Sequence, residues 1–280
     1  MTINEAEKVS NFPNEKILVF IPVYNCQQQI PRVLAQFKSL TNTFYGILIV
    51  DNRSTDASLE VAKTAAQNLA LPVTILLNRE NLGLGGSHKV AFQYAIDHGY
   101  DYCAVLHGDD QGNIHDLVAA LDAGWHRTHD CLLGARFMRG SQLQGYSRLR
   151  TLGNRIFNWI FSAVSGRRLY DLGSGLNLYR VSRLQKSRFA GFANNLTFNY
   201  YLILASVQWQ WNIKFFPISW REDDQISNVR LFRQTRQICA ILFDFCCRRN
   251  HFLHSNNSGR AYDSYQSDTV YSVPMRAAIQ

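Results

Sequence analysis

The sequence has no hydrophobic run long enough to cross a membrane. Its longest late apolar stretch, residues 238–243, ends at Asp244, whereas a spanning helix needs ~20 consecutive apolar residues. The first residues, MTINEAEKVSNFPNEK, are polar and mixed in charge, so they lack the basic start and the apolar centre of a secretion signal. These two absences predict a soluble or peripheral protein.

The cysteines form no disulfide framework. Six are present, in neither a paired C-x-x-C spacing nor the density of a disulfide scaffold, and they stand at positions 26, 103, 131, 239, 246 and 247. Free thiols in a reducing cytosol are the expected state.

Two glycine-rich nucleotide motifs are also missing. A dinucleotide fold has G-x-G-x-x-G directly after its first strand, but PVYNCQQQ stands there, and the phosphate loop G-x-x-x-x-G-K-[ST] is absent. Gly83, Gly85 and Gly86 instead follow the third apolar run and open a helix near Ser87. Such a helix start can hold an anion, and a simple tight turn explains the glycines equally well.

Acidic residues are absent between Asp130 and Asp171, a segment with seven arginines: Arg136, Arg139, Arg148, Arg150, Arg155, Arg167 and Arg168. The whole chain of 280 residues carries 29 Lys+Arg against 21 Asp+Glu, a net charge of +8. This excess indicates an anionic partner: a phosphate ester, a nucleic acid or an acidic lipid surface. No nucleic-acid recognition motif accompanies the charge, so a nucleic acid is the least favoured of the three.

The sequence does contain short apolar runs at regular intervals, within a composition that is 46% apolar. The runs cover residues 17–23, 47–50, 73–77, 102–106 and 131–135. Segments with helical spacing lie between them, such as Ile30, Val33, Leu34 and Phe37. Strands that alternate with helices predict an α/β fold with a mainly parallel sheet that is buried on both faces.

Polar clusters follow four of these runs, where each strand is expected to end, at residues 24–25, 51–56, 78–81 and 107–111. Ligands of parallel sheets bind beyond the carboxyl ends of the strands. The clusters therefore predict one binding crevice, the alternative being ordinary polar loops. Asp51 is expected to bind a base or ribose there, whereas Asp56 is expected to cap the following helix.

The fourth cluster lies in the stretch VLHGDDQGN, residues 105–113. A hard divalent cation takes oxygen ligands, often one or two carboxylates plus substrate phosphates. Asp109, Asp110 and the Gln111 carbonyl can supply them, and the metal would neutralise charge on a departing nucleoside diphosphate. The alternative is an acidic turn that caps the next helix, IHDLVAAL.

With these residues assembled, the chain resembles the family 2 glycosyltransferases with the GT-A fold, and within them the dolichyl- or polyprenyl-phosphate sugar synthases. The matching motifs are FIPVYN, VDNRSTD, NRENLGLGGS, GDDQ, GAR and DLGSGLNLYR, in family order over about residues 16–230. The resemblance implies a Rossmann-like nucleotide-sugar-binding sheet with flanking helices. It also implies an inverting, metal-dependent transfer of a sugar from a UDP- or GDP-linked donor to a polyprenyl phosphate or another membrane-associated acceptor.

The resemblance also implies donor and metal sites. Donor binding falls to Pro22, Tyr24, Asn25, Asp51, Asn81, Gly83 and Asp109, and the Mg²⁺ or Mn²⁺ site to Asp109 and Gln111. His107 stands where the family's Asp-x-Asp usually has its first Asp. Histidine can bind Mn²⁺ but is a poor partner for Mg²⁺, so a metal ligand, a donor to the diphosphate and a packed strand residue all remain open for it.

The acceptor site implied by the resemblance is rich in arginine. Arg148, Arg150 and Arg155 stand where the synthases have acceptor-phosphate arginines, Ser174 and Arg221 complete the site, and Asp109, Asp110, Arg136 and Arg150 form the expected catalytic set. Arginine binds phosphate in a bidentate fork. A phosphate acceptor is already anionic and needs mainly positioning, whereas a hydroxyl needs a general base. The alternative for these arginines is a basic face that touches lipid headgroups, which also suits Arg167 and Arg168.

One segment departs from the family pattern. The relatives' Arg-x-x-Gly-x-Ser-Lys is WREDDQISN here, without the glycine and the lysine, and it contains Glu222, Asp223 and Asp224. If one of these carboxylates is a base, the rival function is a transferase to a sugar hydroxyl in polysaccharide or glycolipid synthesis. A non-catalytic nucleotide-sugar or membrane-binding subunit is a second rival.

The expected organisation has four parts: an N-terminal extension (1–15), a GT-A domain (16–230), a basic amphipathic helix (231–250) and a flexible tail (251–280). The basic helix either lies on an anionic membrane surface or packs on the domain. We expect a cytoplasmic protein, peripheral at the inner face of the membrane, and leave a homo-oligomer open.

Overall fold

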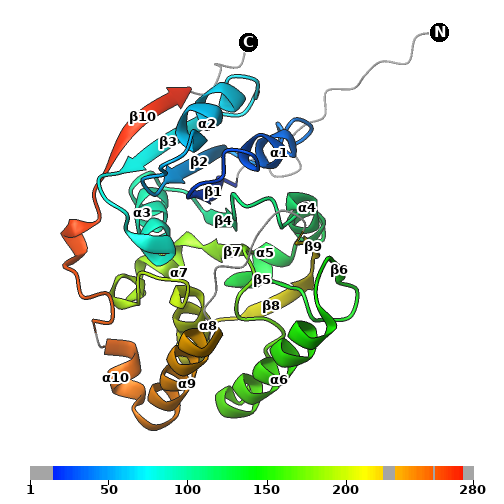
Figure 1. Ribbon diagram of the computed structural model, residues 1–280, viewed down its shortest axis with the longest axis vertical. Helices are drawn as coiled ribbons and strands as arrows, with labels where there is room; N and C mark the ends of the chain where they lie inside the picture. Colours follow the sequence, from blue (N-terminus) through cyan, green and yellow to red (C-terminus); the bar gives the residue numbers. More distant parts are fainter. Residues whose placement is uncertain (1–14, 223–230, 255, 274–280) are drawn as a thin grey trace.

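The computed structural model describes residues 15–222, 231–254 and 256–273. Figure 1 shows its course from β1 to β10. The strands are β1 (Ile17–Val23), β2 (Gly46–Asp51), β3 (Val73–Asn78), β4 (Tyr102–Leu106), β5 (Cys131–Ala135), β6 (Gln142–Gln144), β7 (Leu176–Arg180), β8 (Ile213–Pro217), β9 (Ser219–Arg221) and β10 (Ser267–Val273).

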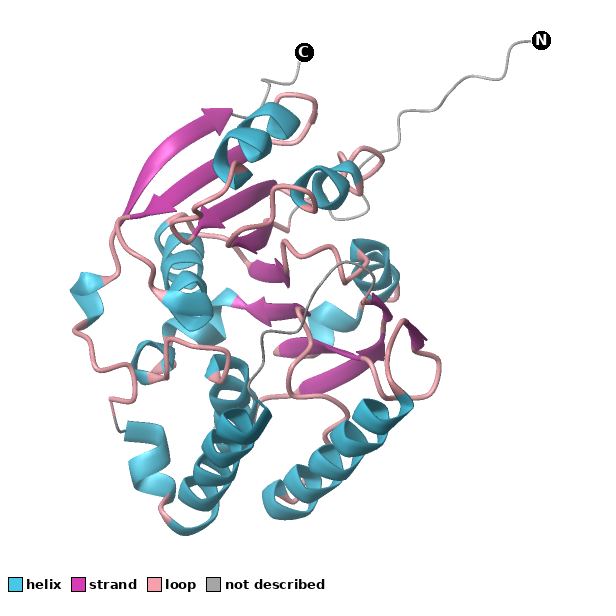
Figure 2. Cartoon of the chain, in the orientation of Figure 1, coloured by secondary structure: helices cyan, strands magenta, loops and turns pink. Residues whose placement is uncertain are grey.

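The helices cover the sheet, and in Figure 2 they lie to either side of the strands. They are α1 (Ile30–Ala35), α2 (Ser58–Ala66), α3 (Gly83–Asp97), α4 (Ile114–Asp122), α5 (Trp125–Thr128), α6 (Arg148–Ser165), α7 (Val181–Gln185), α8 (Phe198–Gln208), α9 (Leu231–Cys247) and α10 (Arg249–His254). Two 3₁₀ helices, η1 (Phe189–Gly191) and η2 (Tyr262–Ser264), complete the set within the described ranges.

The main sheet has the strand order β10-β3-β2-β1-β4-β7-β5-β8. Strands β3, β2, β1 and β4 run parallel, as do β5 and β8, whereas β7 is antiparallel between β4 and β5. The five strands expected from the apolar runs are all present, and the predicted α/β fold with a mainly parallel sheet is confirmed. Strand β7 was not expected, because its sequence LNLYR interrupts the apolar run with Asn177.

The alternation of side chains along each strand produces two cores. Leu18 and Phe20 of β1 point toward α3 and α8, and Val19 and Ile21 point toward α1, α2 and α4. Each of these four side chains is almost fully buried. Because both faces are covered, the strands read as continuous apolar runs, and polar side chains gather where the strands end.

The C-terminal part of the chain contains a strand that the sequence analysis did not predict. Residues 267–273 form β10, which pairs antiparallel with β3 from Ser267 opposite Asn78 to Val273 opposite Val73. The flexible tail expected over residues 251–280 is therefore wrong for this strand. The reason is tertiary: the edge of β3 supplies hydrogen-bond partners that the local sequence does not reveal.

The basic amphipathic helix corresponds to α9, and it packs on the domain. Ile238, Ile241 and Phe245 are buried in the same core as α8. Of the two alternatives for the apolar face of α9, the structure therefore shows packing on the domain. Of the earlier expectation, residues 227–230 lie outside the described residues, as do residues 1–14 of the N-terminal extension. Over the described ranges, no helix combines the length and the apolarity needed to cross a bilayer.

Candidate active site

Asp51 ends β2 at the edge where the strands open into the crevice. Its side chain is buried, Oδ1 accepts a hydrogen bond of 2.8 Å from the Ser54 amide, and Oδ2 has no partner among the described residues. A buried carboxylate oxygen without a donor is costly, so this atom is suited to accept a hydrogen bond from a ligand. Asp56, in contrast, accepts a 2.9 Å bond from the amide of Ser58 at the start of α2, as predicted for a helix cap.

The end of β1 contributes residues of two kinds. Tyr24 is 48% exposed, and its ring is open to stack against a planar ligand. Asn25 instead connects two loops, since its Oδ1 accepts a 2.8 Å bond from the Thr55 amide. The Pro22 carbonyl accepts a 3.1 Å bond from the Gly108 amide, so Pro22 ties the first strand to the predicted metal loop.

The glycine cluster at the start of α3 is a tight turn. The amides of Gly85 and Gly86 donate to the Asn194 carbonyl at 2.7 and 3.3 Å, so they are not directed at an anion. Gly83 has a φ of +72°, and a Cβ there would lie 2.4 Å from the same carbonyl. The Gly83 amide donates to Asn81 Oδ1 at 3.0 Å. Asn81 and Gly83, which were expected to bind the nucleotide-sugar donor, thus shape the turn that borders the crevice.

His107 follows β4 and packs in a narrow slot. Its ring centroid lies 6.1 Å from that of His88, and a Cβ on Gly175 would come within 2.6 Å of its Cγ, so only glycine fits there. Burial, aided by the nearby positive charge of Arg136, lowers the pKa of His107 to about 4. The ring is therefore neutral near pH 7, and its Nε2 is buried without a partner within the described part of the chain.

Asp109 lies two residues further along the same loop. Its Oδ1 accepts a 3.2 Å hydrogen bond from the Gln111 amide, and the described residues place no salt-bridge partner on its carboxylate. Burial raises the pKa of Asp109 to about 6, although the Gln111 amide and Arg136 act in the opposite direction. Asp51 lies opposite Val23 at the end of β1, and on the other side of β1 the Gly108 amide donates to the Pro22 carbonyl, so Asp51 and Asp109 flank the same strand end.

The Asp110 carboxylate, predicted to take part in catalysis and metal binding, is paired with two arginines. Arg32 Nε donates to its Oδ2 at 2.6 Å, and Arg221 forms a second ion pair with the same carboxylate. Arg221 Nε also bonds the Asp110 carbonyl at 2.8 Å. Two guanidinium groups therefore pair with the Asp110 carboxylate. Arg221 was expected to bind the acceptor, and here it joins residues 107–111, the predicted metal loop, to β9.

Gln111 takes part in the same fastening. Its carbonyl, expected as a metal ligand, accepts a 3.0 Å hydrogen bond from the Arg221 amide. Next to it, Gly112 forms an antiparallel bridge with Trp220. The backbone of the loop after Asp109 is thus held by β9. Of the two carboxylates of the loop, Asp110 is ion-paired, whereas Asp109 has no ion pair among the described residues.

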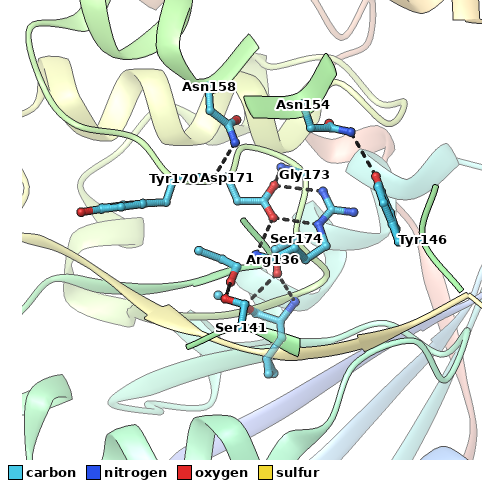
Figure 3. Close-up of polar contacts among 12 residues, drawn as sticks. Arg136, Ser141, Tyr146, Asn154, Asn158, Tyr170, Asp171, Gly173 and Ser174 are labelled. Atoms are coloured by element: carbon cyan, nitrogen blue, oxygen red, sulfur yellow. Dashed lines mark hydrogen bonds and ion pairs between the residues drawn. The ribbon is translucent and has the colours of Figure 1, made fainter. Parts of the chain in front are cut away.

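Arg136 directly follows β5 and is bound to Asp171, and Figure 3 shows the two side chains facing one another. Arg136 Nε and Nη2 donate to the Asp171 carboxylate at 2.7 and 2.9 Å, and the Asp171 side chain is only 2% exposed. Asp171 raises the pKa of Arg136 further above its usual range. The guanidinium also lies 5.0 Å from the Trp220 ring. Arg136 is thus a fixed positive charge near Asp109 and His107, held by a residue that the sequence analysis gave no role.

The three predicted acceptor arginines of α6 have different surroundings. Arg150 Nη1 donates to Glu222 Oε2 at 2.5 Å, and its guanidinium lies 4.6 Å from the Tyr146 ring. Arg148 and Arg155 are exposed. Of these three arginines, Arg150 is the one that the described contacts connect to the end of β9, through Glu222.

Ser174, the remaining predicted acceptor residue, is buried at 3% exposure. Its Oγ accepts a 3.2 Å hydrogen bond from the Leu176 amide, and its carbonyl accepts a 3.0 Å bond from Asn177. Ser174 thus shapes the start of β7, and the structure gives its side chain no open face toward an acceptor.

The residues present fit a divalent cation shared with a substrate. The Asp109 carboxylate accepts a hydrogen bond from the Gln111 amide and has no salt-bridge partner among the described residues, and the His107 Nε2 is buried without a hydrogen-bond partner there. No group of three or more His, Cys, Asp or Glu side chains gathers in the described ranges. A hard cation with few protein ligands takes its remaining ligands from water and substrate phosphates.

Sequence reasoning missed the supporting residues of this site. Arg32 lies on α1, and its partner Asp110 follows 78 residues later. Asn52 accepts bonds from Asn78 at 3.0 Å and the Leu82 amide at 2.8 Å, which joins the ends of β2 and β3. Asn52 belongs to a quoted motif, so its position at a strand end was a usable signal, whereas Arg32 carried none.

Asp51, Asp109 and Arg136 thus lie at or just beyond the carboxyl ends of β2, β4 and β5 in a mainly parallel sheet, the edge where ligands of such sheets bind. The profile described as "Glycosyl transferase family 2" matches residues 18–187, and the chain belongs to this family.

The names of curated relatives refer to polyprenyl phosphates or to a polyprenol monophosphosugar. A polyprenol monophosphomannose synthase of Mycolicibacterium smegmatis is 25% identical over 62% of this chain and 65% of its own length. A dodecaprenyl-phosphate galacturonate synthase of Rhizobium johnstonii is 26% identical over 63% and 51%. An undecaprenyl-phosphate 4-deoxy-4-formamido-L-arabinose transferase of Salmonella paratyphi B is 29% identical over 60% and 50%. The chain thus matches about half to two thirds of the length of these relatives.

Solved structures show the same fold. Glucosyl-3-phosphoglycerate synthase of Mycobacterium tuberculosis, in complex with phosphoglyceric acid, has a TM-score of 0.63 at 15% identity, covering 84% of this chain and 81% of that one. Its complex with Mn²⁺, UDP-glucose and glycerol 3-phosphate has a TM-score of 0.61 at 14% identity, with 84% and 81% covered. These likenesses confirm the predicted GT-A fold.

Proposed function

We propose that this chain is an inverting, metal-dependent glycosyltransferase that moves a sugar from a nucleotide sugar to a polyprenyl phosphate. The observation that carries the proposal is the carboxylate of Asp109, which follows β4 and has no salt-bridge partner among the described residues, beyond the same edge of the sheet as Asp51, which ends β2. The names of the curated relatives support a polyprenyl phosphate as acceptor.

The donor half of the site has separate groups for each part of a nucleotide sugar. Asp51 Oδ2 accepts a hydrogen bond from the ribose, and the exposed Tyr24 ring packs against the base. Asp109 and the Nε2 of His107 would hold Mn²⁺ or Mg²⁺, and the remaining ligands would come from water and the diphosphate. When bound, the ion supplies charge compensation for the departing nucleoside diphosphate, as the Mn²⁺ and UDP-glucose complex of the structural relative suggests.

The acceptor half lies at the start of α6. A phosphate oxygen of the acceptor attacks the anomeric carbon, a new carbon–oxygen bond forms, and the bond to the nucleoside diphosphate breaks with inversion. The acceptor oxygen is already anionic, so no proton has to be removed and positioning is the main requirement. Arg150 is partly exposed and lies next to Tyr146. Its guanidinium releases Glu222 and binds the acceptor phosphate in its place.

A transfer to a sugar hydroxyl is the second candidate, and one contact favours it. Glu222 accepts the 2.5 Å bond from Arg150, which holds a carboxylate at the acceptor side of the crevice, where a hydroxyl would need a base. Asp223 and Asp224, the other acidic residues considered for this role, lie outside the described residues.

The proposal is tested by incubating the purified chain with Mn²⁺ or Mg²⁺ and a panel of UDP- and GDP-sugars, with and without polyprenyl phosphate. Release of nucleoside diphosphate only with the lipid phosphate is the expected result. Release with glycan acceptors alone would favour the hydroxyl transferase, and release under no condition would favour a non-catalytic subunit. We place the enzyme at the inner face of the membrane, where its acceptor lies.

A further inference from the structure

The outward face of α6 is apolar, which is the reverse of an ordinary surface helix. Leu149, Leu152, Ile156 and Trp159 are 79, 56, 52 and 72% exposed. Their spacing of three, four and three residues places them on one stripe of the helix. A contiguous exposed stripe of this kind marks an interaction surface.

The inward face of the same helix is anchored partly by polar contacts, as Figure 3 shows for Asn154 and Asn158. Asn154 Nδ2 donates to the Tyr146 hydroxyl at 3.1 Å, and Asn158 Nδ2 donates to the Tyr170 carbonyl at 2.5 Å. Phe161 is fully buried beside them. These contacts fix the rotation of α6 about its axis, so the apolar stripe is a built feature of the surface.

We infer that this stripe docks the protein on an anionic membrane surface. Arg148 and Arg155 are exposed and lie along one edge of the stripe at helical spacing from Leu152 and Trp159. No acidic residue occurs between Asp130 and Asp171. Tryptophan favours the membrane interface, and arginine keeps its charge among the headgroups while its alkyl stem covers apolar surface.

The charge pattern favours lipid over a second copy of the chain. A two-fold interface through α6 would bring the same patch of both copies together, and the arginines of each would meet arginines with no acidic partner on that helix. An anionic bilayer supplies the opposite charge along the whole edge. In Figure 1 the free end of α6 lies at the outer boundary of the molecule, away from the main sheet, where a flat surface can reach it.

Docking on this face explains how a lipid-borne phosphate reaches the crevice. Arg150 lies in the first turn of α6, one residue from Leu149, and is turned inward to Glu222. A bilayer that contacts Leu149 therefore lies at the first turn of α6, the turn whose inward side carries the Arg150 side chain. This last step rests on the proposed function, whereas the docking itself does not.

The test uses the full chain and sedimentation with phosphatidylcholine vesicles, with and without phosphatidylglycerol. Leu149→Ser/Trp159→Ser removes the ends of the stripe, and the pair Arg148→Gln/Arg155→Gln removes two edge charges. Lys38→Gln/Lys186→Gln, which changes two exposed lysines elsewhere, is the control. We expect binding of the wild type to the anionic vesicles, loss of most of that binding in the serine pair, and a reduction of about fivefold for each arginine removed.

Circular dichroism and thermal unfolding check that each variant is folded. Equal vesicle binding by the wild type and the serine pair, or no binding by the wild type, would overturn the inference. A wild type that is dimeric and does not sediment with vesicles, with a monomeric serine pair, would show that the face joins two copies instead.

Transfer to a short, water-soluble prenyl phosphate separates docking from chemistry. The serine pair should retain wild-type turnover with this acceptor and lose turnover only with vesicle-bound acceptor. If neither protein turns over any acceptor while the vesicle results hold, the proposed function fails and the docking surface stands.

Discussion

Arg150 Nη1 donates a 2.5 Å hydrogen bond to Glu222 Oε2, which joins the first turn of α6 to the end of β9. The same β9 segment binds the metal loop, because Arg221 pairs with Asp110. The proposed acceptor side and the proposed donor side of the crevice are thus connected through two adjacent residues, Arg221 and Glu222. The two candidate acceptors assign different roles to Glu222. With a phosphate acceptor, Glu222 occupies the position on Arg150 that the phosphate takes; with a hydroxyl acceptor, Glu222 is the general base.

Substitution of the two partners distinguishes these roles. For a phosphate acceptor, Arg150→Ala should raise the acceptor KM by about tenfold or more and leave the donor KM unchanged, because a charge-assisted contact is lost. Glu222→Gln should leave kcat nearly unchanged. The measurement is steady-state kinetics with a short soluble acceptor, and Arg148→Ala, whose side chain is exposed, is the matched control. An unchanged acceptor KM in Arg150→Ala contradicts the assignment, and a fall in kcat of about 10²-fold or more in Glu222→Gln would identify a general base.

Asp109 tests the metal site. Asp109→Asn keeps the shape of the side chain and removes its charge, so we expect metal-stimulated release of nucleoside diphosphate to fall by at least about 100-fold. Titration calorimetry with Mn²⁺ and the nucleoside diphosphate should show a parallel loss of metal binding. Asp97→Asn, at the exposed end of α3, should behave as the wild type. Retained metal-dependent turnover in Asp109→Asn would remove the site from this loop.

His107 tests metal preference. His107→Asp replaces a borderline nitrogen with a hard oxygen ligand, so the ratio of activity with Mg²⁺ to activity with Mn²⁺ should rise. The same change should strengthen Mg²⁺ binding in calorimetry. If neither the ratio nor the affinity changes, His107 is a packed strand residue and its unpartnered Nε2 is without function in metal binding.

His88 makes the fold sensitive to acid. Burial lowers its pKa from 6.5 to about 3, so between these two values the unfolded chain binds a proton that the folded chain does not. The stability contributed by neutral His88 is fully present above pH 6.5 and is lost as the pH falls toward 3. The free energy of unfolding should decrease by about 1.4 kcal/mol for each pH unit in that window from this group alone.

The comparison that isolates this effect is His88→Gln, whose amide keeps a donor for the Leu84 carbonyl that accepts from the imidazole at 2.8 Å. Urea unfolding at pH about 7 and about 5 gives the slope for each protein. The variant should lose less stability on acidification than the wild type, and equal slopes would contradict a buried neutral His88.

Much of the site was predictable because strand ends in a parallel sheet converge. Asp51 and Asp109 each follow an apolar run, so their shared crevice required only the regular alternation of strands and helices. The structure kept both carboxylates there and left an oxygen of Asp51 without a partner. What the spacing did not reveal was which polar groups were already occupied, because partners such as Arg32 for Asp110 and Asp171 for Arg136 come from distant segments.

The C-terminal region shows the same division. The helical pattern of α9 followed from its sequence, but whether its apolar face met lipid or protein depended on α8. Strand β10 formed because β3 offers a free edge, and its sequence, SDTVYSV, lacks the continuous apolar run from which the first five strands were predicted.

The sequence by itself determined β1 to β5, the polar clusters that follow the first four of them, and the family, because these depend on local apolar runs and on motifs read in order. Only the tertiary structure decided that Asp109 is open while Asp110 is paired, that Arg150 turns inward while Arg148 and Arg155 turn outward, and that α6 exposes its apolar face. Each of these depends on which distant atoms lie within hydrogen-bond or packing distance, a quantity that no local pattern contains.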